Sequence, residues 1–462
     1  MTLNCEIKMK IKNSDPILIL IFLLILIRPT SAQTNVVHPI DLPTTLRLAG
    51  AQNLDVKIAR EKLAEARANH QSALAQFFPW ISPGVVYRQH DDKIQDVSGN
   101  ILDVHKHSTA AGAAINAQVD FGDAIYKSLA SKQLARAAAH GVEAQRQDSV
   151  LAAAQGYFEL ALAQGTVGVA RDSARISSDY EKQLRNAVEA GLAFKGDALR
   201  VRVQFERSQL TLRQALEQQR IAAARLAQTL RLDPTVELVA QDSELAPLAL
   251  IETNAALHSL VAQSLATRPE LKQSESLIAA ARDTKTGATY GPLIPTLGGS
   301  AFFGTLDGGR RGIADNSGGQ EDYVLGASWR IGPGGLFDFT RVRSAESRLK
   351  IAGLSADKLR DDAARQVVEA FTHWQSLGDQ LETAKRALAA AEEGFHLAQQ
   401  RKEFVVGVVL ETIQTEQDLT RARLDYLKTI AEFNKAQYSL SRVTGRMDDG
   451  PERRRVKPTT AE

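Results

Sequence analysis

The sequence predicts a mainly α-helical protein with a smaller β part, arranged as a two-fold internal repeat. In each half, a helical segment, a proline, two strand-like segments and two further long helical segments follow in the same order, about 215 residues apart. Aromatic residues make up only 6% of a chain rich in alanine, leucine, glutamine, arginine and glutamate, which favours long, closely packed helices. A unit of half the chain is far longer than a solenoid repeat, so we interpret it as a duplicated domain half.

The N-terminus has the pattern of a secretory signal. Lys8, Lys10 and Lys12 precede an unbroken apolar run over 17–27, and the small residues at 30–32 suit cleavage. The run of about 11 residues is shorter than the roughly 20 that a spanning helix needs, although an uncleaved anchor remains an alternative. We therefore predict a signal peptide at 1–32.

Composition limits the other chemistry of the chain. The only cysteine, Cys5, lies before the apolar run, so we expect neither a lipid-acceptor cysteine nor a disulfide in the exported protein. The formal net charge of +2 gives no reason to expect nucleic acid as a partner. No later segment has the length and purity of a transmembrane helix, so a chain that enters a membrane does so through strands.

The helical segments of the first half are unusually long. We expect helices over about 42–76, 123–188 and 196–232, and the middle segment contains no proline. At 1.5 Å per residue its roughly 65 residues span about 100 Å, which is too long for a compact globule of this size. The two flanking helices placed end to end match the long one, so each repeat can form two columns of equal height.

The second half repeats this plan with helices over about 255–286, 339–404 and 409–443. Within the long helix, large and small apolar residues each recur every seven positions. They are Leu381, Leu388 and Phe395, and Ala384, Ala391 and Ala398. This spacing predicts an antiparallel, left-handed coiled coil with close backbones, and an ordinary helical hairpin accounts for it equally well.

A β-hairpin is expected in each half, at 80–121 and 295–331. Apolar residues alternate with polar ones over 111–121 and over 323–331. Such alternation is typical of the strands of a transmembrane barrel, and it also fits a half-buried sheet in a soluble domain.

The partner strands of these hairpins are weaker in pattern. They are expected at 81–89 and 297–305, where the alternation is less clean and Pro83 interrupts the first strand. The connections at 90–108 and 307–322 are long and polar, as on the outside of an outer-membrane barrel.

Four strands cannot close a barrel by themselves. An isolated four-stranded sheet leaves its edge strands unpaired in lipid, so several chains must contribute to one barrel. Three chains would supply 12 strands, enough to enclose water, although the pairing of edges alone permits other multiples.

Several short segments are specific by their order and repetition. A proline follows the first helix of each half, at Pro79 and Pro295, and the strand-to-helix junctions are 119–123 and 334–338. The other marks lie at the tips of the helical hairpins and in the last helix, at 191–199, 404–413, 422–426 and 440–445. Over 42–445 the chain resembles the TolC family of outer-membrane efflux proteins.

This resemblance implies a homotrimer with a shared 12-stranded barrel in the outer membrane and a periplasmic tunnel of long helices. Such a protein is the passive exit duct of a tripartite efflux or secretion system. Its implied partners are outer-membrane lipid, a periplasmic adaptor protein and an inner-membrane transporter. No enzymatic activity and no cofactor are expected. The implied boundaries are 33–245 and 246–445 for the two repeats and 446–462 for a disordered tail.

The resemblance also implies a periplasmic aperture. Aligned on the downstream Ala-Arg pair, Glu411 takes the first acidic position and the uncharged Gln414 takes the second. Three copies of Glu411 would form a carboxylate ring that favours cations and resists closure unless the groups are protonated or paired. Alignment on Gly407 instead moves the acidic role to Glu416, and a position at a helix start also explains Glu411 by itself.

The tips of the helical hairpins are candidate contacts for the adaptor. Gly191, Leu192 and Asp197 match the family pattern in the first repeat, and Gly407 takes the corresponding place in the second. Glycine in a tight turn between helices also has a structural explanation, because it supplies backbone freedom. Apolar residues beside both glycines favour a contact surface.

Catalytic and metal-binding patterns are weak. The chain has no His-Glu-x-x-His motif, nucleophile elbow or phosphate-binding glycine loop. Asp103, His105 and His107 alternate along an external loop and can share a face toward a metal, but a polar loop without metal is the stronger expectation. We predict no catalytic, cofactor-binding or metal-ligating residues. The alternatives to a duct are a soluble periplasmic coiled-coil scaffold and a metal-binding surface protein.

Overall fold

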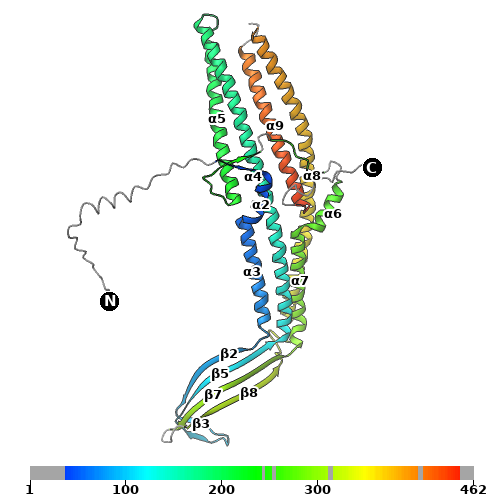
Figure 1. Cartoon of the computed structure of the whole chain (residues 1–462). Helices are drawn as coiled ribbons and strands as arrows, with labels where there is room; N and C mark the ends of the chain where they lie inside the picture. The colour runs from blue at the N-terminus through cyan, green and yellow to red at the C-terminus, as the bar shows by residue number, and fades with distance from the viewer. Residues whose placement is uncertain (1–36, 242–244, 252–255, 311–315, 404–408, 448–462) are drawn as a thin grey trace, which may run out of the picture.

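The molecule is elongated, with a β-sheet at one end and two helical hairpins at the other (Figure 1). The computed structural model describes residues 37–241, 245–251, 256–310, 316–403 and 409–447. The predicted signal peptide at 1–32 lies outside the described residues, as does the predicted tail at 446–462 except for its first two residues.

The first half contains the helices α2 (Leu42–Gln52), α3 (Leu54–Ala75), α4 (Phe121–Glu189) and α5 (Lys195–Leu230). With 69 residues, α4 is roughly 100 Å long. Helix α3 packs along the half of α4 nearer the sheet, and α5 packs along the other half (Figure 1). The expectation that two shorter helices together match the long one is confirmed.

The second half contains α6 (Leu257–Thr267), α7 (Pro269–Tyr290), the short 3-10 helix η1 (Gly291–Leu293), α8 (Phe339–Glu403) and α9 (Val409–Val443). Helix α8 packs against α7 near the sheet and against α9 toward the tips, and α4 contacts both α7 and α9. No helix among the described residues is both long enough and apolar enough to cross a bilayer.

The expectation of one continuous helix over 42–76 and another over 255–286 is wrong, because each is broken after about three turns. At the first break, the Asn53 side chain caps α3 by accepting from the backbone N–H of Asp55 (2.8 Å) and donates to the carbonyl of Thr229 (3.0 Å). At the second break, Pro269 is the first residue of α7, and the residue before a proline is pushed out of the helical region.

Four strands form one antiparallel sheet in the order β2-β5-β7-β8. They are β2 (Trp80–His90), β5 (Lys106–Asp120), β7 (Thr296–Arg310) and β8 (Asn316–Ser328). The predicted strands are confirmed in position, and the hairpins of the two halves are neighbours through β5 and β7. Within the described chain, β2 and β8 each pair on one side only.

Three short features of the β structure differ from the expectation. The segment 90–108 is not a plain loop, because it holds a small hairpin of β3 (Lys93–Gln95) and β4 (Ile101–Asp103), and β5 begins within it. Residues 329–331 lie beyond the end of β8. A parallel pair of β1 (Val37–Ile40) and β6 (Glu237–Ala240) was not expected, because four-residue strands carry too little pattern to be found.

The main hydrophobic core lies near the middle of the molecule, where α2, α4, α5 and the β1–β6 pair meet. Leu46, Tyr157, Leu160, Leu226 and Leu238 are almost completely buried there. A smaller core joins α6, α8 and α9 at the same level. Toward the two ends each helix has fewer partners within the chain, so large parts of the helical surface stay exposed.

Two buried arginines connect four helices at the level of the cores. The Arg442 side chain in α9 is only 5% exposed. It donates to Asp148 of α4 (Nε to Oδ1, 2.8 Å) and to Glu270 of α7. Arg268, beside Glu270, donates to Gln366 of α8 (2.8 Å). The paired charges therefore fix α4, α7, α8 and α9 relative to one another.

Glu270 and Arg442 each stabilise the charged form of the other. Burial alone raises the pKa of Glu270, but the hydrogen bond and positive charge of Arg442 outweigh it, so the pKa lies below its ordinary value of 4.5. Burial likewise favours the neutral form of Arg442, yet its hydrogen bonds to Glu270 and Asp148 raise its pKa. Both groups are charged at neutral pH.

We expect Arg442→Leu to lower the free energy of unfolding by about 3–5 kcal/mol, because it leaves the Glu270 carboxylate buried without its partner. Thermal unfolding followed by circular dichroism measures the loss. The control is Arg446→Leu, four residues away at an exposed position, which should change the stability little. Equal effects of the two substitutions would contradict the role of Arg442.

The stability should also depend on the protonation of Glu270. Because its pKa is lower in the folded than in the unfolded state, its contribution is fully present above about pH 4.5 and is lost as the pH falls through the folded value. The wild type should therefore be more stable than Glu270→Gln at pH 7, and the difference should shrink below pH 4.5. A difference that is the same at pH 7 and pH 3.5 would refute this assignment.

Candidate functional site

The four-stranded sheet has two chemically different faces. Residues directly opposite each other on neighbouring strands share a face, so the register assigns every side chain. Ile81, Ile115, Ala301 and Tyr323 are opposite one another across the sheet and lie on one face. The large apolar side chains of this apolar face are Ile81, Val85, Tyr87, Ile115, Val119, Leu297, Phe303, Tyr323 and Leu325.

The opposite, polar face carries most of the polar side chains and many small residues, together with a few large apolar ones: Trp80, Val86, Phe302, Leu306 and Val324. Its members include Ser82, Asn116, Gln118, Thr296, Ser300, Gln320, Asp322 and Ser328. Apart from Val119, every large residue of the apolar face is at least 42% exposed in the single chain, and Leu325 is 91% exposed. So much contiguous exposed apolar surface on a sheet marks a contact with lipid or with another protein.

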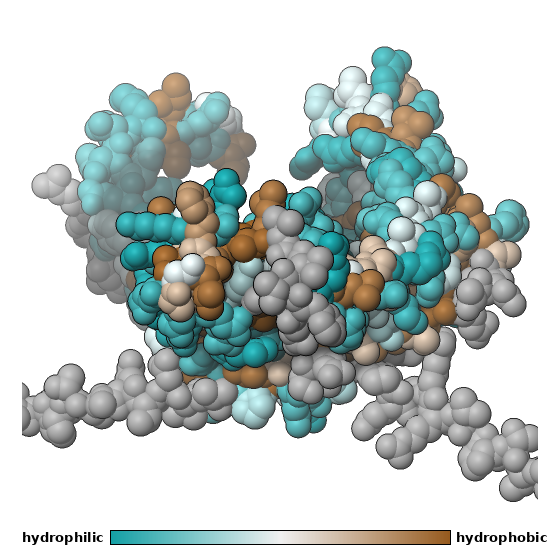
Figure 2. All heavy atoms as spheres, turned by 90° about the horizontal axis from the view of Figure 1, so that it is seen from above, coloured by the Kyte–Doolittle hydropathy of each residue, from teal (hydrophilic) through white to brown (hydrophobic). Residues whose placement is uncertain are grey.

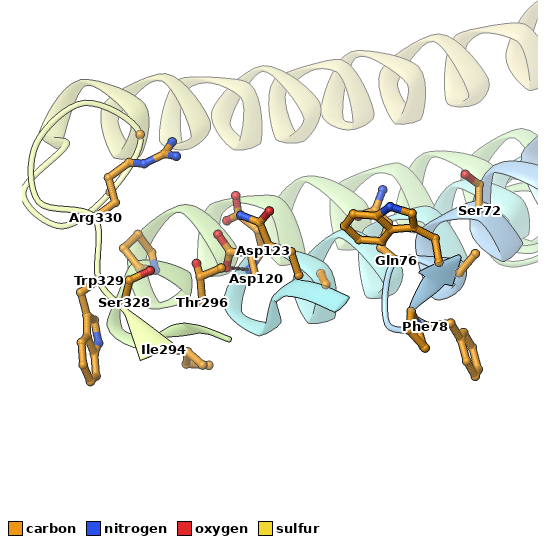
Figure 3. A pocket seen from close by; sticks show the side chains of 18 of the residues that line it. Ser72, Gln76, Phe78, Asp120, Asp123, Ile294, Thr296, Ser328, Trp329 and Arg330 are labelled. Atoms are coloured by element: carbon orange, nitrogen blue, oxygen red, sulfur yellow. Dashed lines mark hydrogen bonds between the residues drawn. The ribbon is translucent and has the colours of Figure 1, made fainter. Parts of the chain in front are cut away.

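The polar face is hollow where the sheet meets the helices. An open groove of about 950 Å³ is lined there by Trp80, Gln118, Thr296 and Ser328, one from each strand of the sheet. Figure 3 shows the carboxylates of Asp120 and Asp123 in this groove, with Arg330 at one end. Since all four strands contribute to one concave surface, the sheet curls around its polar face.

Aspartates make both junctions between strand and helix. Asp120, the last residue of β5, caps α4 by accepting from the backbone N–H of Asp123 (3.1 Å). Asp338 caps α8 by accepting from the backbone N–H of Arg341 (3.0 Å) and also binds the Thr340 hydroxyl and the Gly334 N–H. The Thr340 hydrogen bond, followed by the two backbone bonds, lowers the pKa of Asp338 to about 2.

The two junctions are held against each other. Arg341 of α8 pairs with Asp123 of α4. Gly122 lies so close to Gly291 that a Cβ atom added to it would be 2.0 Å from the Gly291 carbonyl oxygen. Only glycine fits this contact, which explains the glycine in the junction segment 119–123.

At the first helical tip, Gly191 performs the structural role that its position suggested. The backbone N–H of Leu192 donates to Ala187 (2.8 Å) and that of Gly191 donates to Val188 (3.0 Å), which is a Schellman motif. Gly191 has φ +75°, a conformation that favours glycine. Asp197 lies in the first turn of α5 and accepts from Arg200 (3.3 Å). Leu192 is 84% exposed and is therefore available for contact.

At the second tip, Gly407 lies outside the described residues, whereas the two predicted aperture residues are described. Glu411 lies in the first turn of α9 and accepts a 2.6 Å hydrogen bond from Arg401 of α8. Gln414 is exposed one turn later. Glu411 is thus already paired within its own chain, which weakens the charge repulsion expected of a carboxylate ring. Seen from this end, the surface is largely hydrophilic with scattered apolar groups (Figure 2).

Glu416, which the alternative register gives the aperture role, is buried between helices of the single chain. The residue is 4% exposed. Its carboxylate accepts from Ser173 of α4 (2.5 Å), Gln204 of α5 (3.2 Å) and Thr420 of α9 (3.1 Å). Sequence reasoning missed this role, because no local pattern shows which acidic residue of α9 faces another helix. Glu416 joins the two helical hairpins close to their tips.

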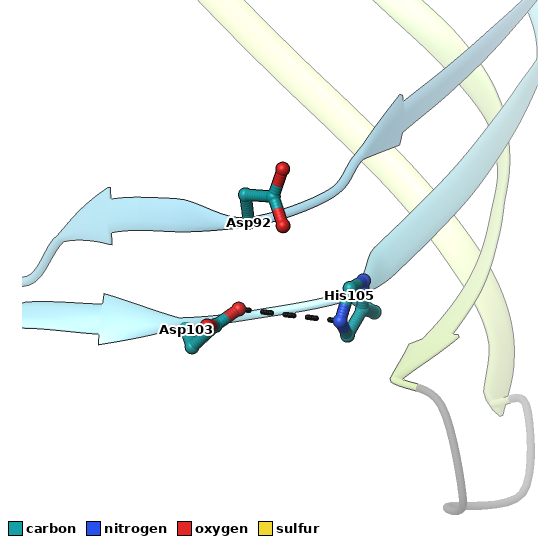
Figure 4. Close-up of side chains that lie close together, drawn as sticks. All are labelled: Asp92, Asp103 and His105. Carbon is teal, nitrogen blue, oxygen red and sulfur yellow. Dashed lines mark ion pairs between the residues drawn. The ribbon is translucent and has the colours of Figure 1, made fainter.

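The external loop brings together a different trio from the one considered from sequence. Asp103 and His105 are neighbours there, and Asp92 takes the third place that His107 was expected to fill (Figure 4). His107 lies within β5, opposite Gln89 and Gly309.

Known proteins match both the sequence and the architecture. A family model described as outer membrane efflux protein matches residues 260–446. Cation efflux system protein CusC of Escherichia coli (strain K12) is 24% identical over 402 residues, which cover 85% of this chain and 83% of CusC. Protein CyaE of Bordetella pertussis is 25% identical over 314 residues, covering 67% and 65%. The chain is thus similar to outer-membrane efflux proteins over most of its length, and its second half matches their family model.

Solved structures agree with the fold of this chain. A membrane protein from Pseudomonas aeruginosa superimposes with a TM-score of 0.75 at 17% identity, covering 87% of this chain and 93% of that one. The Campylobacter jejuni CmeC outer membrane channel gives a TM-score of 0.72 at 14% identity, covering 87% and 85%.

We expect Glu416→Ala to loosen the start of α9, because Ser173 and Gln204 lose their acceptor at a cost of about 1–3 kcal/mol. Hydrogen–deuterium exchange of the amides in 409–420 should become faster by about tenfold. Glu411→Ala removes only a surface ion pair and should have a much smaller effect. If both variants exchange alike, Glu416 does not join the hairpins.

Proposed function

We propose that this chain is the exit duct of a tripartite efflux or secretion system and acts as a passive channel in the outer membrane. The observation that carries the proposal is the sheet, which has one exposed apolar face, one hollow polar face and two edges that pair on one side only. A sheet of this kind suits a barrel wall with lipid outside and water inside.

The two edge strands of the sheet determine how copies of the chain can pair with one another. Successive strands in the sheet are antiparallel, so β2 and β8 run in opposite directions. If β8 of one copy pairs with β2 of the next, the pairing is again antiparallel, and the same contact repeats around a ring. Head-to-tail contacts of this kind form a closed ring when the rotation from one copy to the next divides a full turn evenly. Three copies with four strands each give 12 strands, and we propose this trimer.

The helices extend the same ring. Because α4 begins at the residue after β5 and α8 begins eleven residues after β8, strands arranged in a circle place the helices in a circle. The duplicated halves, 33–245 and 246–445, then contribute equivalent walls to a periplasmic tunnel of roughly 100 Å. The signal peptide at 1–32 accounts for export of the chain, and 446–462 is left as a tail.

The helical tips are the proposed contact for a periplasmic adaptor, which links the duct to an inner-membrane transporter. Gly191 shapes the first tip, and Leu192 is exposed beside it. Asp197 adds a charge at the start of α5. Gly407 is proposed for the same role in the second tip. Exposed apolar residues at the end of a long hairpin favour a protein contact.

The purified protein should form a heat-modifiable trimer in detergent and open a conducting pore in planar bilayers. A soluble periplasmic scaffold, the alternative, would be extracted without detergent and would give no conductance. Conductance from vesicles that lack other proteins would support the duct. Its absence from a correctly folded trimer would reject it.

We expect Leu325→Arg to prevent stable insertion, because it places a charge on the apolar face at a cost of about 2–4 kcal/mol near the bilayer midplane. Val324→Arg is the matched control, since it puts the same charge on the adjacent residue of the polar face. The measurement is the yield of heat-modifiable trimer in the outer-membrane fraction. Val324→Arg should insert, and a greater loss from Val324→Arg than from Leu325→Arg would reverse the assignment of the faces.

Glu411 and Gln414 are proposed to line the periplasmic aperture. Glu411→Gln should reduce the cation preference of the pore, because it removes one carboxylate per chain and leaves Arg401 unbalanced. The double variant Glu411→Gln with Arg401→Gln restores the local charge balance and should recover most of the preference. Reversal potentials under a salt gradient measure the change. Unchanged selectivity in Glu411→Gln would refute the aperture assignment without affecting the fold.

A further inference from the structure

We propose that the first hairpin holds a divalent transition-metal ion at its end far from the helices, bound by Asp92, Asp103 and His105. This site does not depend on the proposed function, because it lies outside both the pore face and the helical tips. From the sequence, Asp103 and His105 were considered as metal ligands together with His107, but no metal site was predicted and Asp92 was not considered.

The fold brings these three residues together from separate positions. β3 and β4 pair so that Lys93 is opposite Asp103, and the backbone N–H of Val104 donates to the carbonyl of Asp92 (2.8 Å). As a result, one ligand atom from each of Asp92, Asp103 and His105 lies within 4.8 Å of the others. Figure 4 shows the three side chains around a common space.

The imidazole of His105 is oriented as a metal ligand requires. Its Nδ1 lies 3.0 Å from the carboxylate Oδ1 of Asp91. Its Nε2 is directed toward Asp103, 4.0 Å from Oδ1. A carboxylate that accepts from one ring nitrogen holds the proton there and leaves the lone pair of the other nitrogen free for a metal.

The donor set indicates which class of metal fits. Two carboxylates and one imidazole suit zinc or a neighbouring first-row ion, while calcium and magnesium prefer oxygen ligands alone. Ligands about 2.0–2.2 Å from a tetrahedral ion are roughly 3.4 Å apart, so the present separations must shorten by about 1 Å. Side chains that are 42% and 60% exposed, as in His105 and Asp103, can rotate by that much. Water completes the fourth position.

A cation already competes for the same oxygens. Lys93 Nζ lies 3.7 Å from Asp103 Oδ2, but both side chains are mostly exposed, and such pairs are weak. Asp91, Asp92 and Asp103 together leave an excess of negative charge. A bound ion would displace Lys93 and tie the β3–β4 hairpin to the start of β5.

The test is zinc binding to the purified full-length protein in detergent, stripped of metal with a chelator and followed by titration calorimetry. We expect one zinc ion per chain. His105→Ala and Asp103→Asn should each weaken binding at least about tenfold, and Asp91→Ala about 10- to 100-fold through the orientation of His105. His107→Ala is the control and should bind as the wild type does. Lys93→Met should bind more tightly, because the competing cation is gone.

Cobalt gives a second measurement that needs no substitution. Cobalt bound to the wild type should show the visible absorption of a site with a nitrogen ligand, and His105→Ala should lose it. Three results would overturn the proposal: zinc binding no tighter in the wild type than in His105→Ala, equal loss in His107→Ala, or equal competition by calcium. The last would indicate a carboxylate site without the imidazole.

Discussion

The pairing of backbone groups at the two edges of the sheet is the constraint on which the rest of the structure depends. In hydrocarbon, an unpaired N–H or C=O group costs several kcal/mol, so a sheet in lipid cannot keep open edges. Within the described chain, β2 and β8 pair on one side only, yet the sheet exposes an apolar face suited to lipid. The four described strands thus suit the membrane wall proposed above but are too few to close it.

The long helices continue from the strands of this sheet. Asp120 caps α4 directly at the end of β5, and Asp338 caps α8 shortly after β8, so each helix begins where the sheet ends. The ion pair between Arg341 and Asp123 then holds these two helices together. Further from the sheet, Arg442 and Glu416 repeat the arrangement, each joining α9 to α4 through buried polar contacts. Long, thin helices with few neighbours need such connections at intervals along their length.

Much of this architecture could be predicted, because its signals are long and periodic. The long helix expected at 123–188 is Phe121–Glu189, and the clean alternation over 111–121 falls at the end of the strand Lys106–Asp120. A heptad spacing or an alternation sustained over many residues leaves few other structures. Pro269 also carried a signal for the break in the second half, since proline at the first turn separates two helices.

What could not be predicted rests on single contacts between distant segments. The break at Asn53 depends on its bond to Thr229, and the burial of Glu416 depends on Ser173 and Gln204. The pairing of β1 with β6 joins residues about 200 positions apart in strands too short to show a period. At the candidate aperture, the sequence placed Glu411 at a helix start but gave no sign of its partner Arg401.

Disulfide cross-linking of the two sheet edges tests the central claim most directly. The only native cysteine, Cys5, lies within the predicted signal peptide, so introduced pairs are unambiguous. Val85→Cys on β2 would be combined in turn with cysteines at 319, 321, 323 and 325 of β8, all on the same face. If neighbouring copies close the wall, one or two of these pairs should yield a covalent trimer on oxidation in the membrane. Monomers for every pair, or bonds only within one chain, would contradict the account.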